Sequence, residues 1–136
     1  MSYLLKRLYL LRNQVIDEEL KAHGLARSQW LILFHVNRAG DLAQKDLQRM
    51  MRVESATLTR IVDSLVKKGW LDRTPSATDK RVKILSLTGD GQVRWKKIPD
   101  PLEIVEKKML LGIDASTRKL LREGVQQMIQ NLEPVE

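Results

Sequence analysis

The chain has 136 residues and no cysteine, and its 24 Lys and Arg residues against 17 Asp and Glu give a net charge of +7. This length fits one domain, and the absence of cysteine excludes disulfide bonds and thiol chemistry. The apolar runs are far shorter than the ~20 residues of a membrane-spanning helix, and no signal peptide precedes the first helix, so we expect a soluble cytoplasmic protein without membrane contact.

The first predicted element is an amphipathic helix over Tyr3–Ala22. Its apolar residues recur every three to four positions, which is the spacing of one helix face. The stripe consists of Leu4, Leu5, Leu8, Leu11, Val15, Ile16 and Leu20. A chain this short has little core with which to cover such a stripe, so we expect it to pack against a second copy of the chain. Helix packing within one chain, with no dimer, is the alternative.

Residues 43–68 predict two helices joined by a short turn. The first, Ala43–Met51, is followed by Arg52-Val53, which leaves too little chain for an antiparallel pair and indicates a helix-turn-helix crossing. In the second helix an apolar stripe must face the core, Gly69 is placed to end the helix, and Glu54 or Ser55 is placed to cap its start. The stripe consists of Leu58, Ile61, Val62, Leu65 and Val66.

The opposite side of the second helix carries small, hydroxyl-bearing and cationic side chains, which can approach base edges and phosphates closely. These are Ala56, Arg60, Asp63, Ser64 and Lys67, flanked by Thr57 and Thr59. Arg60 either contacts DNA, pairs with Asp63 or lies solvated. A bare carboxylate would repel phosphates, so Asp63 is expected to orient a cation, either Lys67 or an arginine of the hairpin that follows.

Two short strands, Trp70–Thr74 and Val82–Thr88, are predicted next because these stretches are rich in β-branched and apolar residues. A polar loop opened by Pro75 joins them into a β-hairpin, which we call the wing. The cations at or near its tip are Lys80, Arg81 and Lys83. Asp79 is expected to order the tip by bonding its own backbone.

The positive charge is concentrated in the helix-turn-helix and the wing. Residues 43–83 hold ten basic side chains and five acidic ones, so +5 of the net +7 lies there. Charge alone is weak evidence, because a basic face is often only solvated. Its coincidence with this order of elements indicates binding to DNA.

A break is predicted after the wing. The helix that begins near Gly89 meets Pro99–Pro101, and proline disfavours both the helix interior and a helical conformation in the residue before it. A helix restarting at Pro101 is expected to run to Leu111, and Asp114 is placed to cap a last helix. The apolar stripe of that last helix, a second dimerisation element, consists of Leu121, Val125, Met128, Ile129 and Leu132.

The sequence lacks the patterns of a catalytic or metal site. It contains no nucleotide-binding glycine loop, no nucleophile motif and no paired carboxylates. His23 and His35 are too few for a zinc site, and His35 is expected to be a partly buried helix residue. Trp30 and Trp70 are expected to anchor the core. We therefore expect neither enzyme activity nor a bound metal or cofactor.

Four short motifs follow one another between residues 58 and 91. L-T-R-I-V-D-S-L begins at Leu58, K-G-W-L-D-R at Lys68, D-K-R at Asp79 and L-T-G-D-G at Leu87. In this order and spacing they resemble the multiple-antibiotic-resistance regulator (MarR/SlyA) family of winged-helix transcription factors. The resemblance covers nearly the whole chain. Its most specific part is the D-x-R of the wing followed six residues later by L-T-x-x-G.

The resemblance implies one domain over residues 1–136 that is mainly α-helical with a small β-hairpin wing. It implies a winged helix-turn-helix DNA-binding lobe over 27–91 and dimerisation helices over 1–22 and 92–136. A homodimer would bind a palindromic operator, with each recognition helix in a major groove and each wing arginine in a flanking minor groove. The DNA-binding residues would be Gln44, Ser55, Thr57, Thr59, Arg60, Ser64, Lys67, Lys80, Arg81 and Lys83.

Relatives in this family are often released from DNA by small phenolic or aromatic carboxylate ligands. The resemblance therefore implies an effector crevice between the dimer helices and the DNA-binding lobe, with Arg12 as the carboxylate partner. Its lining would be Tyr9, Arg12, Trp30 and Phe34, or else these residues only pack the contact. For the chain as a whole, the alternatives are a winged-helix protein-interaction module and an architectural DNA-binding protein without a ligand response.

Overall fold

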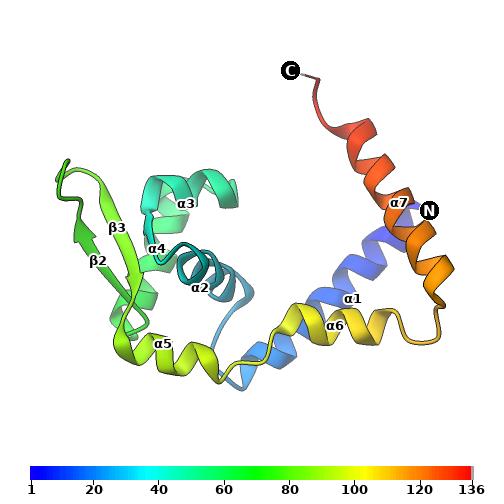
Figure 1. The fold of residues 1–136 in the computed structure, drawn as a ribbon, viewed down its shortest axis with the longest axis horizontal. Helices are drawn as coiled ribbons and strands as arrows, with labels where there is room; N and C mark the ends of the chain where they lie inside the picture. Colours follow the sequence, from blue (N-terminus) through cyan, green and yellow to red (C-terminus); the bar gives the residue numbers. More distant parts are fainter. Residues whose placement is uncertain (136) are drawn as a thin grey trace. The chain divides into compact units, whose positions relative to one another are not determined.

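The computed structural model describes residues 1–135. The chain forms two compact units, Met1–Pro101 and Leu102–Glu136, which are described separately. The first unit contains α1 (Ser2–Lys21), α2 (Arg27–Ala39), β1 (Asp41–Ala43), α3 (Gln44–Met51), α4 (Ser55–Lys67), β2 (Leu71–Pro75), β3 (Lys83–Leu87) and α5 (Gly89–Lys96) (Figure 1). Two further helices are α6 (Pro101–Met109), which starts at the boundary, and α7 (Ala115–Leu132). This mainly α-helical fold with a β-hairpin wing confirms the predicted fold class.

The core of the first unit forms where α2 packs against α4 and against β3. The apolar stripe of α4 is confirmed: Leu58, Val62 and Leu65 are at most 1% exposed, and Ile61 and Val66 are half-buried. Burial of one such side chain stabilises a fold by about 1.5–3 kcal/mol, so the stripe fixes which side of α4 faces outward. The facing side of α2 buries Trp30, Ile32, Leu33 and Val36.

The strands form an antiparallel sheet in the order β1-β3-β2 within the described residues. The hairpin strands β2 and β3 lie within one residue of their predicted limits, and Arg73 pairs with Leu85 at their middle. β1 was not predicted. Ala43 pairs with Ile84 in β1, so the helix predicted to begin at Ala43 begins at Gln44 instead. Three residues of this composition carry no strand signal by themselves, because the pairing is made by the distant strand β3.

The joint between the wing and α5 explains the spacing of the L-T-x-x-G motif. Thr88 caps α5 by accepting a hydrogen bond from the Gly91 N–H at 2.8 Å, and its hydroxyl donates to the Gly69 carbonyl at 2.6 Å. Gly91 is buried against the Trp70 carbonyl so closely that a β-carbon would collide with it. Arg94 lies over the Trp70 ring, 3.9 Å from its centroid, and donates to the Lys68 carbonyl at 3.2 Å.

The predicted break after α5 is confirmed. α5 ends at Lys96, before Pro99, and α6 begins at Pro101. α6 ends at Met109 rather than at Leu111. In the second unit Asp114 caps α7 as predicted, because its carboxylate accepts a hydrogen bond from the Thr117 N–H at 2.8 Å. Hydrogen bonding from the side chain and then the backbone of Thr117, with a further bond from the Ser116 hydroxyl, holds the pKa of Asp114 below its usual range.

Candidate nucleic-acid interface

α3, a short turn and α4 form the predicted helix-turn-helix. The turn is closed by Arg52, whose backbone is left-handed at φ 52° and whose N–H donates to the Gln48 carbonyl at 3.0 Å. Glu54, one of the two residues predicted to cap α4, is its N-cap residue, but its side chain makes no capping hydrogen bond. The first N–H groups of α4 therefore lack a side-chain acceptor within the described residues. A helix start of this kind favours an anionic partner.

Most side chains assigned to the outward side of α4 are exposed there. Those exposed are Ala56, Arg60, Asp63 and Lys67, while Ser64 and the flanking Thr57 and Thr59 are half-buried; Ser55, at the helix start, is exposed as well. Arg60 forms no ion pair or side-chain hydrogen bond within residues 1–135. An unpaired guanidinium on a helix face can donate two parallel hydrogen bonds to a guanine edge or contact a phosphate.

Two hydrogen bonds hold other predicted DNA-binding residues against neighbouring helices. The Gln44 amide nitrogen, at the start of α3, donates to the Thr59 hydroxyl at 3.2 Å. The Gln29 amide nitrogen, near the start of α2, donates to the Ser64 hydroxyl at 3.4 Å. These bonds tie α4 to α3 and α2 and so fix its rotation. Gln29 was missed from the sequence, because its partner lies 35 residues away.

Asp63 forms an ion pair with Arg73 of β2, with 2.6 Å between carboxylate and guanidinium. Of the two cations expected for it, the hairpin arginine is therefore the partner and Lys67 is not. The pair links α4 to the middle of the wing strand β2. It also neutralises the carboxylate that would otherwise repel a phosphate near this face, and it leaves Arg60 unpaired.

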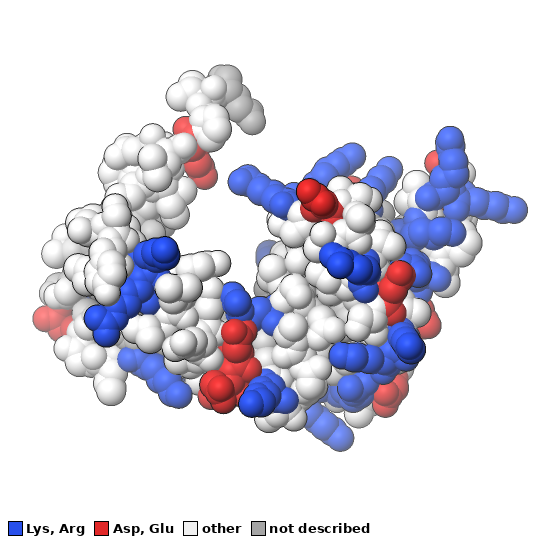
Figure 2. All heavy atoms as spheres, turned by 180° about the vertical axis from the view of Figure 1, so that it is seen from behind, with Lys and Arg blue, Asp and Glu red and all other residues white. Residues whose placement is uncertain are grey.

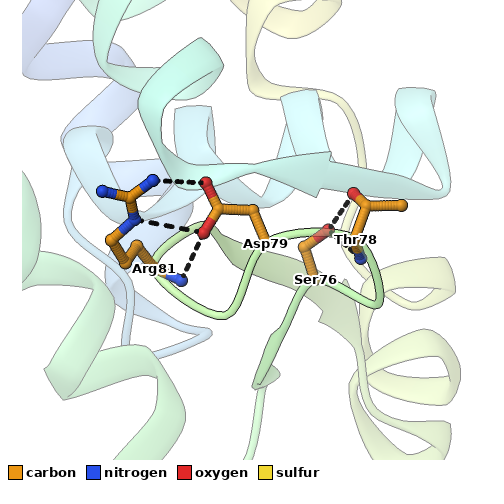
Figure 3. A network of polar contacts seen from close by, with 4 residues as sticks. All are labelled: Ser76, Thr78, Asp79 and Arg81. Atoms are coloured by element: carbon orange, nitrogen blue, oxygen red, sulfur yellow. Dashed lines mark hydrogen bonds and ion pairs between the residues drawn. The ribbon is translucent and has the colours of Figure 1, made fainter.

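The wing tip is ordered by the contacts shown in Figure 3. The Asp79 carboxylate accepts a hydrogen bond from the Arg81 N–H at 3.0 Å, and the Arg81 guanidinium lies 3.3 Å away. The backbone and side-chain hydrogen bonds from Arg81 lower the pKa of Asp79. The Ser76 and Thr78 hydroxyls share a further hydrogen bond of 3.1 Å. The predicted role of Asp79 in ordering the tip is confirmed.

The cations of the wing point into solvent. The Arg81 side chain is 92% exposed, and Lys80 and Lys83 are exposed as well. Figure 2 shows basic side chains projecting from the end of the wing, at the right-hand edge of the view. An arginine held at a hairpin tip is suited to a narrow minor groove, whose negative potential attracts it.

The residues expected to line an effector site fall on two helices. Tyr9 is exposed and Arg12 half-buried on α1. On α2, Trp30 is 4% exposed and stacks between Phe34 and Trp95, with ring centroids 5.4 and 5.7 Å away. Trp30 is thus the core anchor that was predicted, as is Trp70 at 2% exposure. Sequence reasoning missed Trp95, since nothing in the local pattern places it beside α2.

His35 lies half-buried beside this stack, as predicted, and its ring makes a T-shaped contact with Phe34. Burial, with a contribution from Arg38, lowers its pKa. Over residues 1–135, no group of three or more acidic or imidazole side chains is placed to hold a metal ion. None of the helices in that part of the chain is both long and apolar enough to cross a membrane.

The crossed helices, the polar outer face of α4 and the arginine-tipped wing define a winged helix-turn-helix protein. The model of the MarR family matches residues 25–83. The uncharacterised HTH-type transcriptional regulator YdgJ of Bacillus subtilis is 30% identical over 125 residues, which cover 91% of this chain and 76% of YdgJ. The multiple antibiotic resistance protein MarR of Salmonella typhimurium is 33% identical over 80 residues, which cover 59% and 56%. The chain belongs to the MarR family of DNA-binding transcription regulators, which are not enzymes.

Solved structures show the same fold. A mutant MarR from Escherichia coli complexed with operator DNA aligns with a TM-score of 0.83 at 21% identity, over 93% of this chain and 91% of that one. BpsR of Bordetella bronchiseptica, in a structure that concerns regulation of its DNA binding by 6-hydroxynicotinic acid, aligns with a TM-score of 0.80 at 18% identity, over 94% and 91%.

Proposed function

We propose that this chain binds a specific double-stranded DNA sequence as a homodimer on a palindromic operator. The observation that carries the proposal is the outward face of α4, where Arg60 is unpaired next to a wing that presents Arg81. Such a pair suits one helix in a major groove and one hairpin in the adjoining minor groove. The likeness to a MarR structure complexed with operator DNA supports it.

We assign each predicted DNA-binding residue a role that agrees with its position in the structure. Arg60 and Thr57 read base edges, and Arg81 enters the minor groove. The side chains that contact phosphates are Ser55, Lys67, Lys80 and Lys83. Gln44, Thr59 and Ser64 fix the rotation of α4 through their hydrogen bonds and approach the DNA at its edge.

The homodimer is supported by apolar surface that the chain leaves uncovered. The buried residues of α1 are Asn13, Ile16 and Leu20, all past its midpoint. Leucines of its first three turns stay 45–66% exposed: Leu4, Leu5, Leu8 and Leu11. On α7 no residue is buried, and its apolar stripe includes Leu121, Val125, Ile129 and Leu132. Stripes of this kind are energetically costly in water, and a second copy of the chain would cover them.

The proposal includes release from DNA by a small phenolic or aromatic carboxylate effector. Its support is the ligand-regulated relative and the presence of Arg12, half-buried on α1, as a partner for a carboxylate. Tyr9 and Phe34 offer aromatic surface, whereas Trp30 would contact a ligand only if its stack opened. Titration of salicylate against the protein–DNA complex tests this part, and unchanged DNA affinity at saturating salicylate would contradict it.

Selection of bound sequences from a random double-stranded pool tests the main proposal. The expected result is an enriched inverted repeat, bound with an affinity that falls on the order of a thousandfold between 50 and 200 mM salt. Salt-sensitive binding with no enrichment would favour an architectural DNA-binding protein instead. Weak binding with little salt dependence would favour a protein-interaction module.

A further inference from the structure

Arg52 has a left-handed backbone conformation, which among the other described residues is adopted only by glycines. Within residues 1–135, five residues have positive φ, and four of them are Gly24, Gly40, Gly69 and Gly112. The fifth is Arg52, with φ 52° and ψ 43°. In this left-handed region the β-carbon of an L-residue crowds the following carbonyl, which costs free energy that glycine does not incur.

The Arg52 N–H bonds the Gln48 carbonyl, as a glycine at this position could, but no side-chain contact within the described residues compensates for this cost. The Arg52 side chain is exposed and has no ion pair or side-chain hydrogen bond in residues 1–135. Arg60 is likewise unpaired, whereas Arg73 is paired with Asp63 and Arg81 with Asp79. A cation at the C-terminus of α3 interacts favourably with the helix dipole, but this gain is smaller than the left-handed penalty.

The position of Arg52 indicates which contact could offset the free-energy cost of its left-handed backbone. It caps the C-terminus of α3 and is the first residue of the turn of the helix-turn-helix, three residues before α4 begins at Ser55. The first turn of α4 lacks a side-chain cap, and in the proposed complex this end of α4 enters the major groove. The walls of that groove are phosphates, and an extended arginine at the turn is within reach of them.

We propose that Arg52 is a phosphate-binding residue, retained at the helix-turn-helix turn in spite of its strained backbone because its guanidinium contacts DNA. This inference rests on the proposed DNA-binding function. It adds a contact that the sequence pattern of α4 and the wing does not include. Because the partner is a phosphate, Arg52 would contribute to affinity on any sequence and not to the choice of base.

The test compares full-length variants on a labelled mixed-sequence duplex, so that no operator need be known. Arg52→Gly removes the charge and relieves the backbone, whereas Arg52→Lys keeps both the charge and the strain. Arg122→Gln on α7, an exposed arginine without a partner in the described residues, is the matched control for loss of one positive charge. The measurements are the thermal midpoint without DNA and the affinity as a function of salt.

We expect the loss of Arg52 to change thermal stability and DNA affinity in opposite directions. Arg52→Gly raises the thermal midpoint, weakens DNA binding about fivefold per bound protomer at 0.15 M salt, and lowers the salt slope by about 0.9 per protomer. Arg52→Lys and Arg122→Gln stay close to the parent protein in slope. An Arg52→Gly variant with unchanged affinity and slope, or with a lower thermal midpoint, would overturn the inference alone. Parent protein that binds without salt dependence would overturn the proposed function, and this inference with it.

Discussion

Replacing Gly91 by alanine should destabilise the joint between the wing and α5. The new β-carbon would meet the Trp70 carbonyl oxygen, and the two would have to separate by about 1 Å to reach ordinary contact. That carbonyl accepts the Thr88 N–H at 3.1 Å, so the movement weakens a backbone hydrogen bond worth about 1 kcal/mol and disturbs the Thr88 cap. Overpacking adds about 1–3 kcal/mol, and the better helix propensity of alanine returns about 0.5–1 kcal/mol.

The net loss in the free energy of unfolding for Gly91→Ala is therefore about 1–3.5 kcal/mol. Gly89→Ala is the matched control, because Gly89 lies in the same helix and no atom lies within 4 Å of its added β-carbon. Urea unfolding followed by circular dichroism, at equal protein concentration because a dimer is expected, measures both. Equal stability of the two variants would refute the close packing at Trp70.

Three further predictions concern the interface and acid stability. Arg81→Ala should weaken DNA binding most on operators with AT-rich flanks. An equal loss of affinity on operators with AT-rich and GC-rich flanks would argue against a minor-groove contact. Arg60→Ala should cost about 1–3 kcal/mol of binding and relax preference at one base pair of each half-site, while a uniform loss would indicate phosphate contact only. The pKa of Asp114 is lowered in the folded chain, so its contribution to stability is present at neutral pH and is lost as pH falls through the folded pKa. Asp114→Asn should therefore lose less stability than the parent between about pH 5 and pH 2, and parallel acid titrations of the two would contradict this.

Elements with a local sequence signal could be predicted, and this accounts for most of the fold. The α4 stripe, the stop at Gly69 and the break before Pro101 each follow from periodicity or from the backbone limits of one residue. The ordered conformation of the wing tip could be predicted from Asp79, because an aspartate carboxylate often accepts a hydrogen bond from the backbone N–H two residues further along the chain.

Features that depend on distant partners could not be predicted in the same way. β1 exists because Leu42 pairs with Leu85. The contact of Gln29 with Ser64 and the stacking of Trp95 on Trp30 likewise join separate elements. For Asp63 two candidate partners could be named from the sequence, and only the tertiary structure distinguishes them.

The central claim is that α4 and the wing of each protomer read DNA together in a symmetric dimer. Hydroxyl-radical footprinting of the purified protein on a selected duplex tests it most directly, because the radical attacks sugars along the minor groove. The account predicts two protected flanks, related by the centre of the inverted repeat, and loss of both flanks in Arg81→Ala while protection at the centre persists. A single asymmetric footprint, or flanks that remain protected in Arg81→Ala, would contradict the account.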